Sequence, residues 1–397
     1  MPPRPTPAEA LAAEALAAEA LAVAQAIARE LVTAELPDAS LRGSSGVWLL
    51  VHELGGAPAV PRATVRRWEA AAIAALPVLD ASFFEGMLGC AWLLALLGRA
   101  RAELAAVDDA VLDVLHGRWD GGLAAFGGGL AGFGSYGLAR LDTRAGRRIV
   151  RRCVARFGEL AHRDGSAAWW TPGAAALPEV LRDQAPPLWN REGSAAAVGF
   201  LAAARGIDRS ALPLARRGAR PLALQLGRAL HDRIGVATPH AAPGLIHGSG
   251  TWALGGAGAV AALLSVAHAT RDFEAAASCG RMLADLDPEA CAASDASLGT
   301  GTAGIACVMQ ALAEATHQPV FTFAADHWHR RTLRCRSSGV GIAGYLHVDA
   351  LGSGTAGGGR WAPRPGLLEG AAGTALSLLC AARGTRGSPW FARCLVA

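Results

Sequence analysis

Seven segments of the chain share one hydrophobic pattern, in which closely spaced glycines precede an apolar run without a polar face. The run Cys90–Gly98, CAWLLALLG, is a typical example, and in the fourth copy Ala196 replaces the second glycine. Such glycines let the backbone turn sharply and approach its neighbours, and a helix that is apolar on every side is buried. The pattern therefore predicts seven buried helices. Their first glycines are Gly43, Gly86, Gly129, Gly193, Gly255, Gly301 and Gly370.

Half-exposed helices are predicted between these copies. In Arg147–Leu160, RRIVRRCVARFGEL, apolar residues such as Ile149 and Phe157 recur at helical spacing, while arginines occupy the other face. Successive first glycines are 43, 43, 64, 62, 46 and 69 residues apart, and two equal steps among seven copies indicate a repeat protein. The longer steps contain predicted loops at Ser166–Gly173 and Leu351–Gly366.

Two concentric rings are the simplest arrangement that accounts for alternating buried and half-exposed helices, with the buried helices forming the inner ring. We therefore expect an all-α fold, a double-layered α/α toroid of seven inner and seven outer helices, with the glycine turns gathered at one end around a central cavity. A straight solenoid is the rival architecture, but it does not require inner helices that are apolar on every side. The predicted parts are an Ala-rich N-terminal helix at 1–36 and the toroid at 37–397.

The composition restricts the class of protein. Hydrophobic residues make up 52% of the 397 positions, which excludes general disorder, and the aromatic share of 6% disfavours a β-sandwich or propeller. All 37 basic residues are arginines, yet the net charge of +4 is too small and the arginines are too scattered to indicate a nucleic-acid partner. The eight cysteines are far apart and include no C-x-x-C motif, so free thiols are expected.

The chain is expected to be a soluble cytoplasmic protein without a membrane span. No segment reaches the roughly 18–20 uninterrupted apolar residues that a span needs. The Ala-rich start carries Glu9, Glu14 and Glu19 and lacks a basic n-region, so it is predicted to be neither a secretory signal nor an anchor.

Two further motifs are weak. The pattern G-x-G-x-x-G occurs at 132–137, 299–304 and 352–357, but none of these follows a β-branched strand run, as a dinucleotide site requires. His327 and His329 in D-H-W-H are two residues apart, about 200° around a helix. We therefore expect that they do not share a metal and that both lie on the helix surface.

Two ionisable residues near the glycine turns are candidates for chemistry. His247 lies five residues before Trp252, at the end of the fold where the turns are expected to gather. It is either a catalytic group or a lone histidine without a chemical role. Glu192 lies at the fourth turn, where it is either a general base or a solvated carboxylate.

From about residue 37 to residue 382, the glycine turns resemble those of the lanthionine synthetase C-like family, the lanthipeptide cyclases. The resemblance is carried by TWALGGAG at Thr251–Gly258, SLRGSSG at Ser40–Gly46, SFFEGMLG at Ser82–Gly89 and LLEGAAGTALSLL at Leu367–Leu379. It implies the family's double-layered α/α toroid, in agreement with the architecture expected from the repeats.

The resemblance also implies an activity. Members of the family close thioether rings in a ribosomally made peptide, by adding a cysteine thiolate to a dehydroalanine or dehydrobutyrine that a dehydratase made earlier. A zinc ion held by two cysteines and one histidine ionises the thiol. One ligand comes from a W-C-x-G-x-x-G motif, and two come from a C-H-G-x-x-G motif.

This chain departs from the family at these positions. Ala253 stands where the first cysteine would be, and Gly299 and Thr300 replace the Cys-His pair. Glu192 replaces the histidine of the family's A-H-G motif, and Ala125 replaces the aspartate before the third turn. We therefore expect no metal and no other cofactor, with a replacement metal site as the remaining alternative.

Two functions from different classes follow from this comparison. The first is a zinc-independent cyclase acting on a ribosomal precursor peptide, with Glu192 and His247 as candidate acid/base residues. Asn190, Trp252 and Thr300 are then candidate substrate-binding residues. The second is a catalytically silent toroid that binds the modified peptide, its dehydratase or another biosynthetic enzyme as a scaffold.

Overall fold

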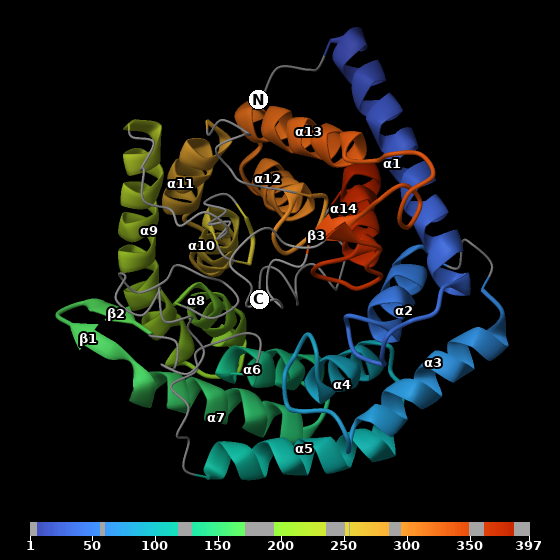
Figure 1. The fold of residues 1–397 in the computed structure, drawn as a ribbon. Coiled ribbons are helices and arrows are strands. Elements are labelled where there is room, and N and C mark those ends of the chain that lie inside the picture. The colour runs from blue at the N-terminus through green and yellow to red at the C-terminus, as the bar shows by residue number, and fades with distance from the viewer. Residues whose placement is uncertain are drawn as a thin grey trace. The chain divides into compact units, whose positions relative to one another are not determined.

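Helices dominate the computed structural model of the protein (Figure 1). The structure describes residues 6–55, 60–117, 129–170, 194–235, 251–253, 255–285, 295–348 and 361–384. Within these ranges there are fourteen α-helices, one short 3-10 helix and two hairpins of two short strands each. The predicted all-α class is therefore confirmed for the described part of the chain.

Seven helices begin at the residue that follows the first glycine of a repeat, which confirms the predicted buried helices. In the fourth of them, every residue from Ser194 to Ala202 is buried. The glycine turns thus set the start of each helix, and the apolar run that follows is its body. The seven are α2 (Ser44–Glu53), α4 (Met87–Leu96), α6 (Leu130–Ala139), α8 (Ser194–Ala203), α10 (Gly256–Thr270), α12 (Thr302–Thr316) and α14 (Ala371–Arg383).

Seven longer or more polar helices alternate with the buried ones. In one of them, α7, Ile149, Val150, Cys153 and Phe157 are buried while the arginines face outward, as the helical spacing predicts. Each of these helices therefore has one face in the core. They are α1 (Pro7–Thr33), α3 (Arg62–Ala75), α5 (Arg101–His116), α7 (Arg144–Leu160), α9 (Ala211–Gly235), α11 (Glu274–Ala284) and α13 (Pro319–Arg334).

The chain divides into two compact units. Unit 1 is formed by Met1–Trp68, Ala229–Ala257 and Ala277–Ser388. Unit 2 is formed by Glu69–Arg228, Gly258–Ala276 and Pro389–Ala397. Each unit is therefore assembled from segments that are far apart in the sequence.

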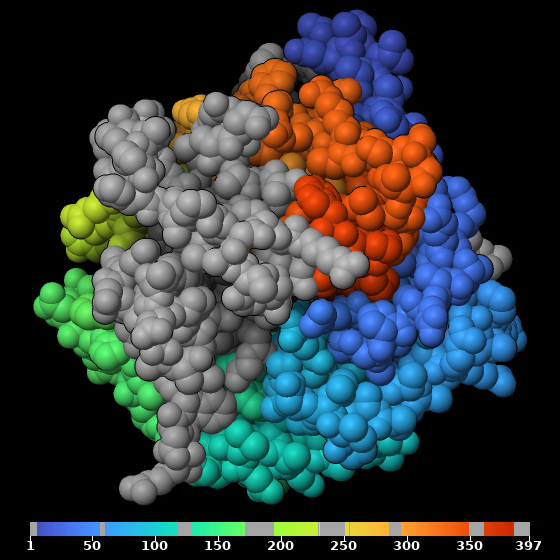
Figure 2. Space-filling view, in the orientation of Figure 1, coloured from blue at the N-terminus to red at the C-terminus, as the bar shows by residue number. Residues whose placement is uncertain are grey.

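Helix α1 belongs to unit 1 and packs along α14 and the end of α13 (Figure 1). Leu16, Ile27 and Leu31 are among the residues that it buries. Its first turns are exposed and project beyond α13 in the space-filling view (Figure 2). The Arg330 guanidinium of α13 donates to the carbonyl oxygen of Ala12 at 3.2 Å. Among the described helices, α1 is the one that reaches the length and hydropathy of a membrane span, a test that the core helix of a soluble protein and a signal sequence near the N-terminus also pass.

Unit 2 contains a hairpin where the sequence predicted a loop at Ser166–Gly173. Strand β1 (His162–Asp164) pairs antiparallel with β2 (Ala167–Trp169). Gly165 supplies the positive φ of +53° that the tight turn needs. The rings of His162 and Trp169, paired across the strands, stack at 6.0 Å between their centres. Cross-strand pairing, which the sequence pattern did not reveal, therefore overrides the loop prediction at 167–169.

Unit 1 contains the second hairpin. Strand β3 (His347–Val348) pairs antiparallel with β4 (Trp361–Ala362). The second strand lies inside the loop predicted at Leu351–Gly366, so that prediction is wrong at these two residues. The part of the loop at 351–360 lies outside the described residues.

Close approach between backbones explains the glycines inside the turns. A Cβ added at Gly304, in the first turn of α12, would overlap the carbonyl oxygen of Leu298 and would lie 2.9 Å from the Cβ of Trp252. A Cβ at Gly373, in the first turn of α14, would overlap the carbonyl oxygen of Leu367. These contacts are with backbone atoms, which cannot rotate away.

We predict that Gly304→Ala lowers the free energy of unfolding by about 2 kcal/mol or more, because the added methyl forces the α12 turn away from Leu298. In contrast, Gly158→Ala in α7 should raise it by up to about 1 kcal/mol, because nothing lies within 4 Å of the added Cβ and alanine favours the helix. Urea unfolding followed by circular dichroism measures both. Equal effects of the two substitutions would contradict the close-approach explanation.

Candidate functional site at the glycine turns

Four glycine turns of unit 1 are joined by a ladder of backbone hydrogen bonds. The N–H of Ala253 donates to the carbonyl oxygen of Gly299 at 2.8 Å, which links the fifth turn to the sixth. Gly299 in turn donates to Leu368 at 2.7 Å, linking the sixth to the seventh. Leu367 donates to Leu41 at 2.8 Å, linking the seventh to the first. The gathering of these turns at one place is therefore confirmed within unit 1.

The ladder brings two predicted substrate-binding residues into neighbouring turns. Trp252 precedes Ala253 and is fully buried, with its Cβ against the first turn of α12. Thr300 follows Gly299 and is also buried. Its hydroxyl oxygen lies 3.2 Å from that of Ser297, and its N–H donates to the same serine hydroxyl at 3.3 Å. Both residues are thus buried beneath the junction of the fifth and sixth turns and stabilise it by packing and hydrogen bonding.

The other predicted site residues lie outside the described part of the chain. The stretch at 171–193 contains Asn190 and Glu192, and the stretch at 236–250 contains His247. Ala125 lies in a third such stretch, at 118–128. Their roles remain predictions from the sequence.

The sequence analysis missed an aspartate that organises three of the turns. The triplet Asp-Ala-Ser occurs at 38–40, 80–82 and 295–297, and its aspartate lies five or six residues before the first glycine of the repeat. In each, a carboxylate oxygen accepts from the serine N–H, at 2.7, 2.9 and 2.9 Å. The aspartate carbonyl accepts from the first N–H of the following helix, at 2.9, 2.8 and 2.9 Å. The recurring triplet was the signal that could have revealed this.

At the sixth turn the aspartate makes a further contact. The second carboxylate oxygen of Asp295 accepts from the N–H of Val348 in β3 at 2.8 Å, and Asp295 is buried. This bond fixes β3 beside the turn that carries Gly299 and Thr300.

His347, the other residue of β3, is a buried imidazole with a defined tautomer. The Thr374 hydroxyl donates its one hydrogen to the carbonyl oxygen of Ala296 at 2.8 Å. It must therefore accept from Nε2 of His347, which lies 3.0 Å away. Nδ1 then carries the lone pair and has no hydrogen-bond partner among the described residues. Burial lowers the pKa of His347 to about 4, against an opposing pull from the Asp295 carboxylate.

The surface prediction is wrong for one of the two α13 histidines. His327 is exposed, as expected, but His329 is fully buried, and neither of its ring nitrogens has a partner among the described residues. Burial lowers its pKa to about 4. The reason is that α13 packs against α1 and α14 as well as α12, so its buried face is wider than that of a helix with one neighbour.

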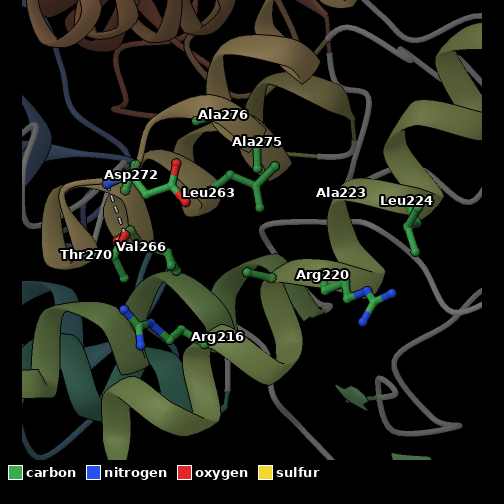
Figure 3. Close-up of a pocket in the computed structure, with 12 residues that line it drawn as sticks. Arg216, Arg220, Ala223, Leu224, Leu263, Val266, Thr270, Asp272, Ala275 and Ala276 are labelled. Atoms are coloured by element: carbon green, nitrogen blue, oxygen red, sulfur yellow. Dashed lines mark hydrogen bonds between the residues drawn. The ribbon is translucent and has the colours of Figure 1, made fainter. Parts of the chain in front are cut away.

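The described residues that line a groove of about 480 Å³ in unit 2 do not include Trp252 or Thr300 (Figure 3). Its walls come from α9, α10 and α11 and are mainly apolar, with Leu263 and Val266 on one side and Arg216 and Arg220 on α9. The carboxylate of Asp272 at its edge accepts from the Glu274 N–H at 3.1 Å and so caps α11. Among its described lining residues, Asp272 is the one carboxylate, so these residues form no acid/base pair.

Comparison with solved structures gives a likeness to nisin cyclase that bears on the fold. The chain superposes on nisin cyclase with a TM-score of 0.65 and 14% sequence identity, over 94% of this chain and 96% of that one. The chain has the fold of nisin cyclase. The predicted fold class, the all-α toroid of the lanthionine synthetase C-like proteins, is thereby confirmed. No protein-family model matches the chain, and no curated protein matches it by sequence.

The residues at the expected metal positions do not fit zinc. The side chains of Ala253, Gly299 and Thr300 are a methyl, a hydrogen and a hydroxyl within reach of Ser297. Zinc sites in proteins use thiolate, imidazole or carboxylate ligands. Within the described ranges, no group of three or more such side chains is placed to hold a metal ion.

The two buried histidines predict a pH dependence of stability. Both have folded-state pKa values near 4, below the value of about 6.5 in an unfolded chain. Between these values the unfolded chain binds protons that the folded protein does not, so the free energy of unfolding should fall as the pH is lowered from 7 to 4. Denaturant unfolding at pH 7 and pH 5 measures this.

Replacing one histidine should reduce this dependence. His329→Leu removes one titrating group from the core, so the difference in stability between pH 7 and pH 5 should shrink. His327→Leu, at the exposed neighbouring position, is the matched control and should keep most of the difference. An unchanged difference in the His329 variant would contradict the assignment.

Proposed function

We propose that this protein acts in the maturation of a ribosomally made peptide and closes thioether rings without zinc. The observation that carries the proposal is the backbone ladder that joins the turns bearing Trp252, Ala253, Gly299 and Thr300, within the fold of nisin cyclase. The substrate class comes from that neighbour's name, and the family resemblance of the glycine turns supports the same reaction.

The chemistry does not demand a metal. In the reaction, the sulfur of a peptide cysteine bonds to Cβ of a dehydroamino acid, and Cα takes up a proton. A thiol of ordinary pKa, about 8.5, is roughly 3% ionised at pH 7, so full ionisation gains only about thirtyfold in thiolate population, or about 2 kcal/mol. Holding sulfur and Cβ in reacting geometry contributes up to roughly 7–11 kcal/mol. Positioning therefore outweighs ionisation.

The proposed roles of the residues follow from these two steps. Trp252 and Thr300 lie buried beneath the junction of two turns and support the rim where the peptide would lie, and Asn190 is the third proposed peptide-binding residue. Glu192 and His247 are the proposed groups that take the proton from sulfur and return one to Cα. These assignments rest on their places at the glycine turns in the sequence.

Ring closure should be measurable directly. We predict that the purified protein accelerates loss of alkylatable thiols from dehydrated, cysteine-containing precursor peptides at least tenfold over buffer. A zinc chelator such as 1,10-phenanthroline should leave the rate unchanged. Mass spectrometry after thiol alkylation provides the measurement. If no peptide reacts faster than in buffer while the protein binds it, the scaffold function replaces the cyclase.

Two substitutions test the proposed proton-transfer residues. Glu192→Gln and His247→Gln should each lower the rate of ring closure more than tenfold. The matched control is His327→Gln, which changes an exposed histidine on α13 and should leave the rate within twofold of the unaltered protein. Equal rates in all three variants would remove both residues from the mechanism.

Restoring the family's ligands tests whether the three positions converge. The variant Ala253→Cys/Gly299→Cys/Thr300→His should bind one zinc ion, because the Ala253 N–H already touches the Gly299 carbonyl oxygen at 2.8 Å. A Cβ at position 299 meets the Leu368 carbonyl oxygen at 3.3 Å, which a small shift relieves. Cobalt-substitution spectra report thiolate ligation.

The control for this experiment keeps Ala253. The double variant Gly299→Cys/Thr300→His should bind zinc at least tenfold more weakly than the triple variant, because it lacks the thiolate from the fifth turn. Equal affinities would mean that position 253 does not face the other two.

A further inference from the structure

Helix α7 concentrates the positive charge of the chain. It carries six arginines and one glutamate, an excess larger than the net charge of +4 of all 397 residues. The rest of the chain is therefore slightly acidic. All six arginines lie on the half of the helix opposite the buried residues, and the outermost pair, Arg144 and Arg156, are about 18 Å apart along the axis at 1.5 Å per residue.

Two of the six arginines have a structural role. Arg152 and Arg156 donate from Nε to the carbonyl oxygen of Leu115 at 3.0 and 3.3 Å, at the last turn of α5. Arg156 also donates to the Gly117 carbonyl and pairs with Glu159 at 2.8 Å. Cations at this position satisfy the free carbonyls and oppose the helix dipole. These two side chains hold α5 against α7.

The other four arginines do not hold α5 against α7. Arg147 donates to the Leu141 carbonyl at 2.9 Å, and Arg151 makes a marginal contact of 3.4 Å to the Ile207 carbonyl. Within the described ranges, no carboxylate lies within 4 Å of Arg144, Arg147, Arg148 or Arg151. We call these four residues the basic face of α7.

A hollow beside the basic face is lined by three arginines and one histidine. It has a volume of about 250 Å³, lies between α5 and α7, and is lined in part by His116, Arg148, Arg151 and Arg152. The Nδ1–H of His116 donates to the Leu112 carbonyl oxygen at 2.6 Å, which turns its Nε2 away from that bond. Two residues of the basic face, Arg148 and Arg151, therefore also line this recess.

Acidic residues of α5 form no ion pairs with the basic face among the described residues. Asp109 and Asp113 are exposed on that helix, but among the described residues neither forms an ion pair within 4 Å of an α7 arginine. Four like charges on one helix face repel each other, which is unfavourable unless an anionic partner offsets it.

We propose that the basic face of α7 and its hollow bind an acidic, extended peptide segment. Guanidinium groups bind carboxylates in a planar, two-bonded geometry. The four arginines of the basic face span about 10 Å along the axis at 1.5 Å per residue, a distance that about three residues of extended chain cover. A nucleic-acid strand fits less well, because no Phe, Tyr or Trp is among the described residues that line the hollow and can stack on a base.

Fluorescence anisotropy of fluorescein-labelled octaglutamate tests the proposal, and it needs no ring-closing activity. The protein should bind this peptide at low ionic strength and lose affinity as salt is raised, while a labelled Gln-Ser octapeptide should not bind. Arg148→Gln/Arg151→Gln should weaken binding at least tenfold. It spares Arg152 and Arg156, so the contact between α5 and α7 stays intact, which circular dichroism and the melting temperature check.

The matched control removes an equal charge elsewhere in unit 2. Arg216→Gln/Arg220→Gln changes two exposed arginines one turn apart on α9 and should leave the affinity within twofold. An equal loss in both variants, or no binding of octaglutamate by the unaltered protein, would overturn the proposal. So would tighter binding of a labelled eight-nucleotide single strand, which would assign the face to nucleic acid.

Discussion

The ladder of backbone hydrogen bonds between glycine turns is the constraint on which the candidate site depends. Backbones can come this close only where no Cβ stands between them. A Cβ at Gly304 would lie 2.9 Å from the Cβ of Trp252 in the fifth turn, and one at Gly373 would lie 2.9 Å from the Cβ of Leu298 in the sixth. The glycines are therefore fixed by contact between neighbouring turns, and the position of every residue in those turns follows from them.

Turns held in this way do not need a bound ion to stay together. The fifth and sixth turns are joined directly by the Ala253–Gly299 hydrogen bond. Asp295 closes the sixth turn through its serine and ties it to β3, and Thr374 connects the same turn to His347. This explains how the fold can be preserved at positions where the resemblance would place metal ligands and this chain has a methyl and a hydrogen.

The sequence predicted the structure correctly where a local pattern determines the start of a helix or its buried face. Glycine spacing located the start of all seven buried helices, and helical periodicity identified the buried face of α7. The predictions from sequence failed where contact with a distant segment determines the structure. His329 is buried because α1 covers α13, and residues 167–169 become a strand because they pair with 162–164. The role of Asp295 also depends on β3, which lies more than fifty residues away. Asn190, Glu192 and His247 stay predictions, since they lie outside the described residues.

Burial of the site has a consequence for the proposed reaction. In this protein burial raises the pKa of the Cys153 and Cys279 thiols, and a substrate thiol placed in an equally apolar setting would be ionised even less than in water. The same burial keeps His347 neutral and weakly basic. A zinc-free cyclase built on these turns must therefore bind the cysteine where water or a charged group still reaches the sulfur. That requirement points to the rim of the glycine turns, where Glu192 and His247 are expected, rather than to the buried junction beneath it.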